Sequence, residues 1–116
     1  MKNENIIKTK SFLFSVRIVN LFKNLTQDKK EFVISKQLLR SGTSIGALVR
    51  ESEHAESRAD FIHKLSIALK EANETEYWLD LLNETNYLSE IEYVSIQTDI
   101  KEILKLLVSI IKTSKQ

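Results

Sequence analysis

The sequence predicts an all-α fold, an antiparallel up-down four-helix bundle, on three observations. Apolar residues recur at three- and four-residue spacing through four long segments, which is the period of an amphipathic helix. The chain has no proline, only two glycines and no alternating strand pattern. Short polar connections separate the segments, which favours antiparallel neighbours. With 116 residues, the chain is expected to form a single domain, 1–116.

The first helix is expected over about residues 5–25. Its core face carries five apolar residues: Ile7, Phe14, Ile18, Leu21 and Leu25. A second apolar stripe, formed by Phe12, Val16 and Val19, lies roughly opposite the first. A helix of a monomeric four-helix bundle needs only one apolar stripe, so the second indicates packing against another subunit. An imprecise helix phase is the competing explanation.

The second helix is expected from Glu31 to Ser52, opened by a capping box over residues 28–31. Its core stripe has four members: Leu38, Gly42, Ile45 and Val49. The opposite side carries five residues: Arg40, Thr43, Ser44, Ala47 and Glu51. Small residues there, with Gly42 and Gly46 four apart, indicate that another backbone approaches closely on more than one side. Alternatively, the glycines only weaken the helix, by about 1 kcal/mol each relative to alanine.

The third helix is expected from Arg58 to about Asn86, with Ser57 as its N-cap. Its core stripe has six members: Phe61, Leu65, Ala68, Ala72, Thr75 and Leu79. The fourth helix is expected to open at a capping box over residues 89–92 and to run to about Lys112. Its inward face has seven members: Tyr93, Ile96, Ile100, Ile103, Leu104, Leu107 and Ile111.

The third helix also carries a second apolar group on its far side, formed by Ile67, Trp78 and Leu81. An apolar patch rimmed by polar groups often marks a protein contact. Glu74 belongs to this face and is a candidate to pair with an arginine of another subunit. Glu76 projects close to the core stripe and therefore needs a basic or hydrogen-bonding partner, which the sequence does not identify.

The stretch 37–82 resembles a known family. The segment RSGTSIGALVRE, followed by ESRADFIHKLSIALKEANETEYWLDLL, is similar to bacterial four-helix bundle proteins called 23S rRNA intervening-sequence proteins, whose relatives include the accessory protein of diversity-generating retroelements. The likeness covers nearly the whole chain. Leu48 stands where the family commonly has Asn, so no polar role is carried over to it. The resemblance implies a homo-oligomeric ring, typically a pentamer, associated with RNA or another nucleic acid.

The second faces of the first three helices, opposite their core stripes, predict an interface between subunits. It contains eleven residues: Phe12, Val16, Val19, Arg40, Ser44, Ala47, Glu51, Ile67, Glu74, Trp78 and Leu81. Within this set, Arg40, Glu51 and Glu74 are expected to form the polar pairs that set the register between subunits.

The charge distribution suggests where a nucleic acid would bind. The net charge is only +1, but residues 1–56 carry ten basic and six acidic side chains, and residues 57–99 carry three and nine. Either the acidic third helix complements basic neighbours, or the charges only keep the faces solvated. Ten basic residues are candidates for phosphate contacts: Lys8, Lys10, Arg17, Lys23, Lys29, Lys30, Lys36, Lys101, Lys105 and Lys112. With no recognition-helix or RNA-module signature, contacts to backbone and shape are expected.

Catalytic and metal chemistry are not expected. The sequence has no cysteine, nucleophile-elbow motif or glycine-rich phosphate loop. Glu51-x-x-His54 has the spacing of a di-iron ligand pair, with Asp60-x-x-His63 as a weaker echo, but Glu51 is expected to face away from the core. We therefore predict a cytoplasmic, non-enzymatic scaffold without cofactor or membrane span, which binds RNA through basic surfaces. The alternative is a protein–protein interaction module without nucleic-acid binding.

Overall fold

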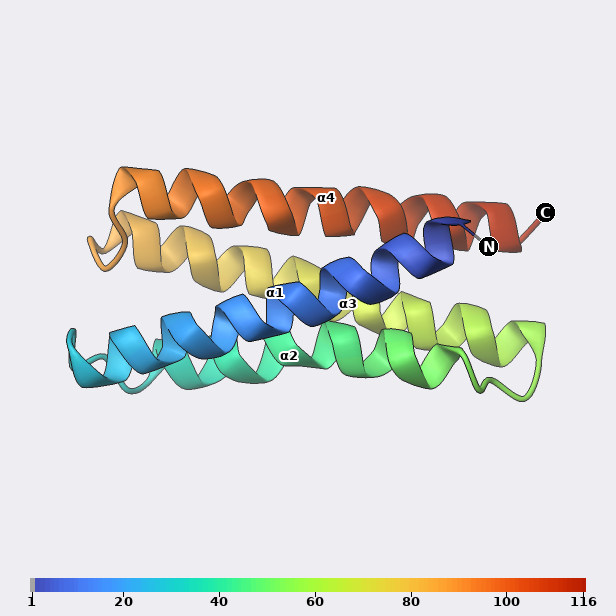
Figure 1. Cartoon of the computed structure of the whole chain (residues 1–116), viewed down its shortest axis with the longest axis horizontal. Coiled ribbons are helices and arrows are strands. Elements are labelled where there is room, and N and C mark those ends of the chain that lie inside the picture. The colour runs from blue at the N-terminus through green and yellow to red at the C-terminus, as the bar shows by residue number, and fades with distance from the viewer. Residues whose placement is uncertain (1) are drawn as a thin grey trace.

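The computed structural model describes residues 2–116, which form four α-helices joined by short connections (Figure 1). They are α1 (Lys2–Gln27), α2 (Ile34–Ser52), α3 (Arg58–Glu84) and α4 (Glu90–Ser114). No strand forms anywhere in residues 2–116. Consecutive helices run antiparallel and pack side by side, and α4 returns to pack against α1. The predicted all-α fold with four helices is therefore confirmed.

The two ends of the bundle differ in what they carry. One end holds both termini and the α2–α3 connection (Figure 1). The other end holds the α1–α2 connection, residues 28–33, and the α3–α4 connection, residues 85–89, and is called the two-connection end below. Because α1 crosses the bundle obliquely, it packs more extensively against α2 than against α4. None of the four helices combines the length and hydropathy needed to cross a membrane, as far as residues 2–116 go.

The core consists of the inward stripes that the helical period predicts. All predicted core positions are buried except four that are partly buried: Leu21, Phe61, Tyr93 and Leu104. Leu82, Leu88 and Ile110 join the core without having been predicted. One polar pair is buried between α2 and α3, where the Thr75 hydroxyl donates to Ser41 Oγ at 2.9 Å. Thr75 therefore occupies a core position without leaving its hydroxyl unsatisfied.

Gly42 and Gly46 allow α1 to approach α2 closely. A Cβ on Gly42 would lie 2.9 Å from Cγ1 of Ile18, and a Cβ on Gly46 would lie 3.1 Å from the carbonyl oxygen of Ser11. Both distances are shorter than ordinary van der Waals contacts, so any larger residue would push the helices apart. The predicted close approach is confirmed on one side only, where the approaching element is α1 of the same chain. A close approach on the opposite side of α2 stays a prediction.

The predicted start of the second helix is wrong. α2 begins at Ile34, and the residues expected to form its capping box lie in the connection instead. Glu31 acts as the cap from outside the helix: its carboxylate accepts hydrogen bonds from the backbone N–H groups of Val33, Ile34 and Ser35 at 3.1, 3.0 and 2.6 Å. These are N-terminal donors that have no partner within the helix. A carboxylate there also interacts favourably with the helix dipole.

Replacing Glu31 with glutamine is expected to lower the free energy of unfolding by about 1–2 kcal/mol at neutral pH, because one amide oxygen replaces two carboxylate oxygens. Burial raises the pKa of the Glu31 carboxyl, but the backbone hydrogen bonds from Ser35, Ile34 and Val33 outweigh it and hold the pKa below 4.5. This stabilisation is present above pH 4.5 and is lost as the pH falls through the lowered pKa. Urea unfolding at pH 7 and pH 3 should therefore show a smaller difference between wild type and E31Q at pH 3; an equal difference at both would contradict the capping role.

The other helix ends follow from local chemistry. The Ser57 hydroxyl accepts from the Asp60 N–H at 3.0 Å, and Ser89 and Glu92 form a reciprocal capping box, as predicted. α3 ends earlier than expected, at Glu84. Asn86 follows in the left-handed conformation with φ 67°, while Tyr87 N–H donates to Leu82 O at 2.9 Å. This is a Schellman motif, in which asparagine takes the position usually filled by glycine.

Candidate nucleic-acid and subunit interfaces

The second stripe of α1 lies on the surface of the chain. Phe12, Val16 and Val19 are 53%, 44% and 36% exposed, so the predicted second face exists and is not absorbed into the core. The Arg50 guanidinium lies 5.7 Å from the centre of the Phe12 ring, in a cation–π contact between α2 and α1. The stripe therefore offers an apolar surface to a partner, with one ring already held in place.

The polar residues of the predicted interface pair within the chain. Arg40 bridges two carboxylates of α3, Glu71 at 3.0 Å and Glu74 through a second, short contact. The Trp78 indole N–H also donates to Glu74, at 2.9 Å. Glu74 was a candidate to pair with an arginine of another subunit; within the chain it pairs with Arg40 of α2, and a contact with another subunit stays a prediction. The network orients Arg40 on the surface, and its role between subunits stays a prediction.

The remaining interface candidates differ in exposure. Ala47 is exposed and Ser44 is partly buried. Glu51 is exposed and pairs with Lys64 of α3 at 3.2 Å. The three apolar candidates of α3 are all partly buried: Ile67, Trp78 and Leu81. Trp78 was expected to face solvent, but it packs against the core. The α3 face is thus less open than the α1 stripe.

Four of the ten candidate phosphate-binding residues already hold acidic partners. Lys8 pairs with Glu53, Lys10 with Glu102, Arg17 with Asp99, and Lys101 with Glu76. The last pair, at 3.1 Å, supplies the partner that Glu76 requires. Exposed ion pairs of this kind contribute little to stability. They nevertheless compete with a phosphate for the same cation.

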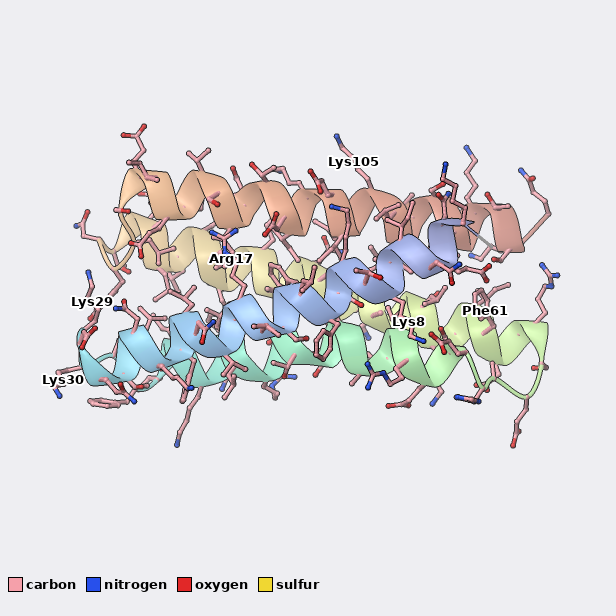
Figure 2. The ribbon with its side chains drawn as sticks, viewed as in Figure 1. Lys8, Arg17, Lys29, Lys30, Phe61 and Lys105 are labelled. Carbon is pink, nitrogen blue, oxygen red and sulfur yellow. The ribbon has the colours of Figure 1, made fainter. Side chains whose placement is uncertain are left out.

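The other six candidates form no salt bridge within residues 2–116: Lys23, Lys29, Lys30, Lys36, Lys105 and Lys112. Of these six, Lys29 interacts electrostatically with a carboxylate, that of Glu92. Four of them surround the α1–α2 connection, and Figure 2 shows Lys29 and Lys30 at the two-connection end, with Lys105 projecting from α4. The set formed by Lys23, Lys29, Lys30 and Lys36 is called the lysine quartet below. Acidic residues of the α3–α4 side lie at the same end. Among them, Glu92 has a lowered pKa, because Ser89 N–H donates to it and Lys29 and Arg17 attract its charge.

The possible metal ligands do not assemble. Within the part of the chain that the structure describes, no group of three or more His, Asp or Glu side chains could hold a metal ion. α2 ends at Ser52, so His54 lies beyond the helix that carries Glu51 and the two do not share a helical face. A hollow of about 450 Å³ lies beside Phe61 and is lined mainly by apolar atoms. Figure 2 shows Phe61 at the end that holds the termini.

Phe32 and Val33 were not predicted as site residues, and they are 55% and 73% exposed in the α1–α2 connection. Because the second helix was expected to begin at Glu31, both residues were assigned to its first turn. One feature of the sequence could have identified them: Glu31 precedes a helix-forming run, and its carboxylate can cap the first N–H groups of that helix. A helix capped in this way begins after Phe32 and Val33, which places both residues in the connection.

Comparison with known proteins places the chain in a family. The sequence model of the 23S rRNA-intervening sequence protein matches residues 3–109. The chain belongs to this family. A crystal structure of a protein with unknown function from the S23 ribosomal protein family of Bacteroides thetaiotaomicron VPI-5482 is similar, with a TM-score of 0.93 and 64% sequence identity over 95% of this chain and 98% of that chain. None of the curated proteins matches. The resemblance drawn from residues 37–82 is thus confirmed for family and fold.

Proposed function

We propose that this member of the 23S rRNA-intervening sequence protein family is a non-enzymatic scaffold, assembled into a homo-oligomeric ring, that binds structured RNA through its phosphates. The observation that carries the proposal is the lysine quartet, whose four cations gather within fourteen consecutive residues at one end of the bundle and form no salt bridge within residues 2–116. A phosphate can contact these cations without displacing a carboxylate. In a ring, copies of the quartet would add their potentials.

If lysines bind RNA through its phosphates, the affinity should depend strongly on the salt concentration. Each lysine that neutralises a phosphate releases condensed counterions, so the logarithm of the binding constant falls linearly with the logarithm of the salt concentration. Binding through backbone and shape should also vary little with base sequence. The proposal is therefore tested by the change of RNA affinity with salt concentration, because the affinity at a single salt concentration does not report the number of phosphate contacts.

The variant with all four quartet lysines changed to glutamine is expected to bind a structured RNA more weakly and to flatten the salt slope by about 3, since each lost contact contributes about 0.7–0.9. The measurement is fluorescence anisotropy of a labelled RNA hairpin between 50 and 200 mM salt. Exposed lysines rarely support the fold, so circular dichroism should be unchanged.

The matched control removes the same charge elsewhere, through glutamine at four exposed basic residues outside the candidate set: Lys2, Arg58, Lys70 and Lys115. We expect this control to keep most of the slope. If both variants lose the same slope, binding is spread over the whole surface and the quartet has no special role. If wild type shows no salt-dependent binding, the RNA function itself is wrong.

The assembled state is expected from the exposed α1 stripe, because a stripe of this kind is stabilised when another copy covers it. Native mass spectrometry of the purified protein should give a discrete multiple of the 13.4 kDa chain, and five copies would agree with the family resemblance. The mass is recorded before and after nuclease treatment, so that bound RNA is not mistaken for additional subunits. A monomer in both samples would contradict the assembly.

A second candidate is a protein–protein interaction module that binds no nucleic acid. It is favoured by Tyr77, which is 59% exposed and packs edge-on against Trp78 at 5.0 Å, next to the Arg40 network. A tyrosine with this exposure beside a partly buried tryptophan is a common contact surface. Two results together would favour this candidate. The wild type would bind no RNA, and a protein that co-purifies with the wild type would be lost from the Tyr77→Ala variant.

A further inference from the structure

Phe32 lies at the two-connection end, within the residues that join α1 to α2. Its side chain is 55% exposed, whereas the preceding residue, Glu31, is only 8% exposed. Phenylalanine has no polar atom, so the exposed part of its ring is stabilised when an apolar or aromatic surface covers it.

The connection that carries Phe32 is tied at both ends. Glu31 N–H donates to Leu25 O at 2.8 Å, which fastens the connection to the last turns of α1. The Glu31 carboxylate binds the first N–H groups of α2, and Ser35 Oγ donates to Glu31 O at 2.8 Å. Lys30 adopts the left-handed conformation with φ 57°, which ends α1 together with the hydrogen bond from Glu31 N–H. The ring is therefore presented by an ordered backbone, which lowers the entropy cost of binding.

The Phe32 ring differs from the other exposed aromatic rings of residues 2–116. Phe12 is paired with the Arg50 guanidinium, and Tyr77 is packed edge-on against Trp78. Phe32 has neither a ring nor a cation partner in the described chain. One aromatic ring at this end is thus available to a flat partner.

The surroundings of Phe32 select the kind of partner. Lys29 and Lys30 precede it, and Lys36 follows in the first turn of α2. An aromatic ring flanked by cations that form no salt bridge is the arrangement found in single-stranded nucleic-acid sites, where a base stacks on the ring while lysines contact the phosphates. A duplex would satisfy the lysines but would offer the ring no free base face.

We propose that Phe32 is a stacking platform for an unpaired base, so that the two-connection end prefers single-stranded or loop RNA to duplex RNA. This inference rests on the proposed function. It adds a preference for strandedness, which the lysine quartet alone does not provide.

The test compares wild type with Phe32→Ala and Phe32→Trp on two labelled probes, a twelve-nucleotide oligouridine and a twelve-base-pair RNA duplex, by anisotropy at one low salt concentration. Phe32→Ala is expected to weaken oligouridine binding by about 5- to 100-fold, the range of a lost base stack, and to leave duplex binding unchanged. Phe32→Trp should retain affinity and show quenching on oligouridine binding beyond that of wild type.

The matched control is Val33→Ala, which removes apolar surface from the neighbouring, more exposed position without removing a ring. It should leave binding to both probes unchanged. If Phe32→Ala binds both probes like wild type while the quartet variant binds neither, the stacking role is wrong and the proposed function stands. If wild type binds neither probe, both are wrong. A lower native mass for Phe32→Ala would show that Phe32 contacts another copy, which also overturns the stacking role.

Discussion

Replacing Phe14 with alanine is expected to lower the free energy of unfolding by about 3–5 kcal/mol. Phe14 is 2% exposed on the inward face of α1, and the truncation leaves a cavity that the surrounding helices fill only in part. Phe12→Ala, two residues earlier on the same helix, is the matched control. Phe12 is 53% exposed, so its truncation is expected to cost less than about 1 kcal/mol. Urea unfolding at one fixed protein concentration measures both values.

The same two variants separate folding from assembly. If the α1 stripe contacts another subunit, Phe12→Ala should lower the native mass of the protein while each chain stays folded by circular dichroism. Because assembly stabilises the folded chain by mass action, the two variants are compared at a protein concentration low enough for the wild type to dissociate. Equal destabilisation of Phe12→Ala and Phe14→Ala under those conditions would contradict the assignment of inward and outward faces.

Gly42→Leu is expected to destabilise the protein by about 3 kcal/mol, although leucine is the better helix former. A single Cβ on Gly42 already lies 2.9 Å from Cγ1 and 3.0 Å from Cγ2 of Ile18. Ile18 is fully buried, so it has no free volume into which to move. The measurement is again urea unfolding. Gln37→Leu, at an exposed position of the same helix, is the control and should change stability by less than about 0.5 kcal/mol.

A double-mutant cycle identifies the contact that causes the loss. Ile18→Ala alone is expected to cost about 2–5 kcal/mol through its cavity. When Gly42→Leu is added to Ile18→Ala, the leucine enters the vacated volume, so the double variant should be more stable than the sum of the two losses by about 1–2 kcal/mol. Strict additivity would show that α1 and α2 do not meet at this pair.

The local pattern of residues was sufficient for the helices and their inward faces. Helical period depends on neighbours three and four positions apart, so Leu65 and Ile100 could be assigned to the core without knowing what they pack against. The caps at Ser57 and Ser89 are also local, since each side chain binds an amide three residues away. The family was likewise accessible from the segment 37–82.

The contacts between helices required the tertiary structure. Pairs such as Lys101 with Glu76, or Arg40 with Glu74, depend on the axial register and rotation of one helix against another, which a period of 3.6 residues does not encode. For the same reason, the sequence could not separate the four candidate cations that form salt bridges from the six that do not. The exposure of Phe32 depends on Glu31 folding back onto α2, a choice decided by burial and by hydrogen bonds from several amides together.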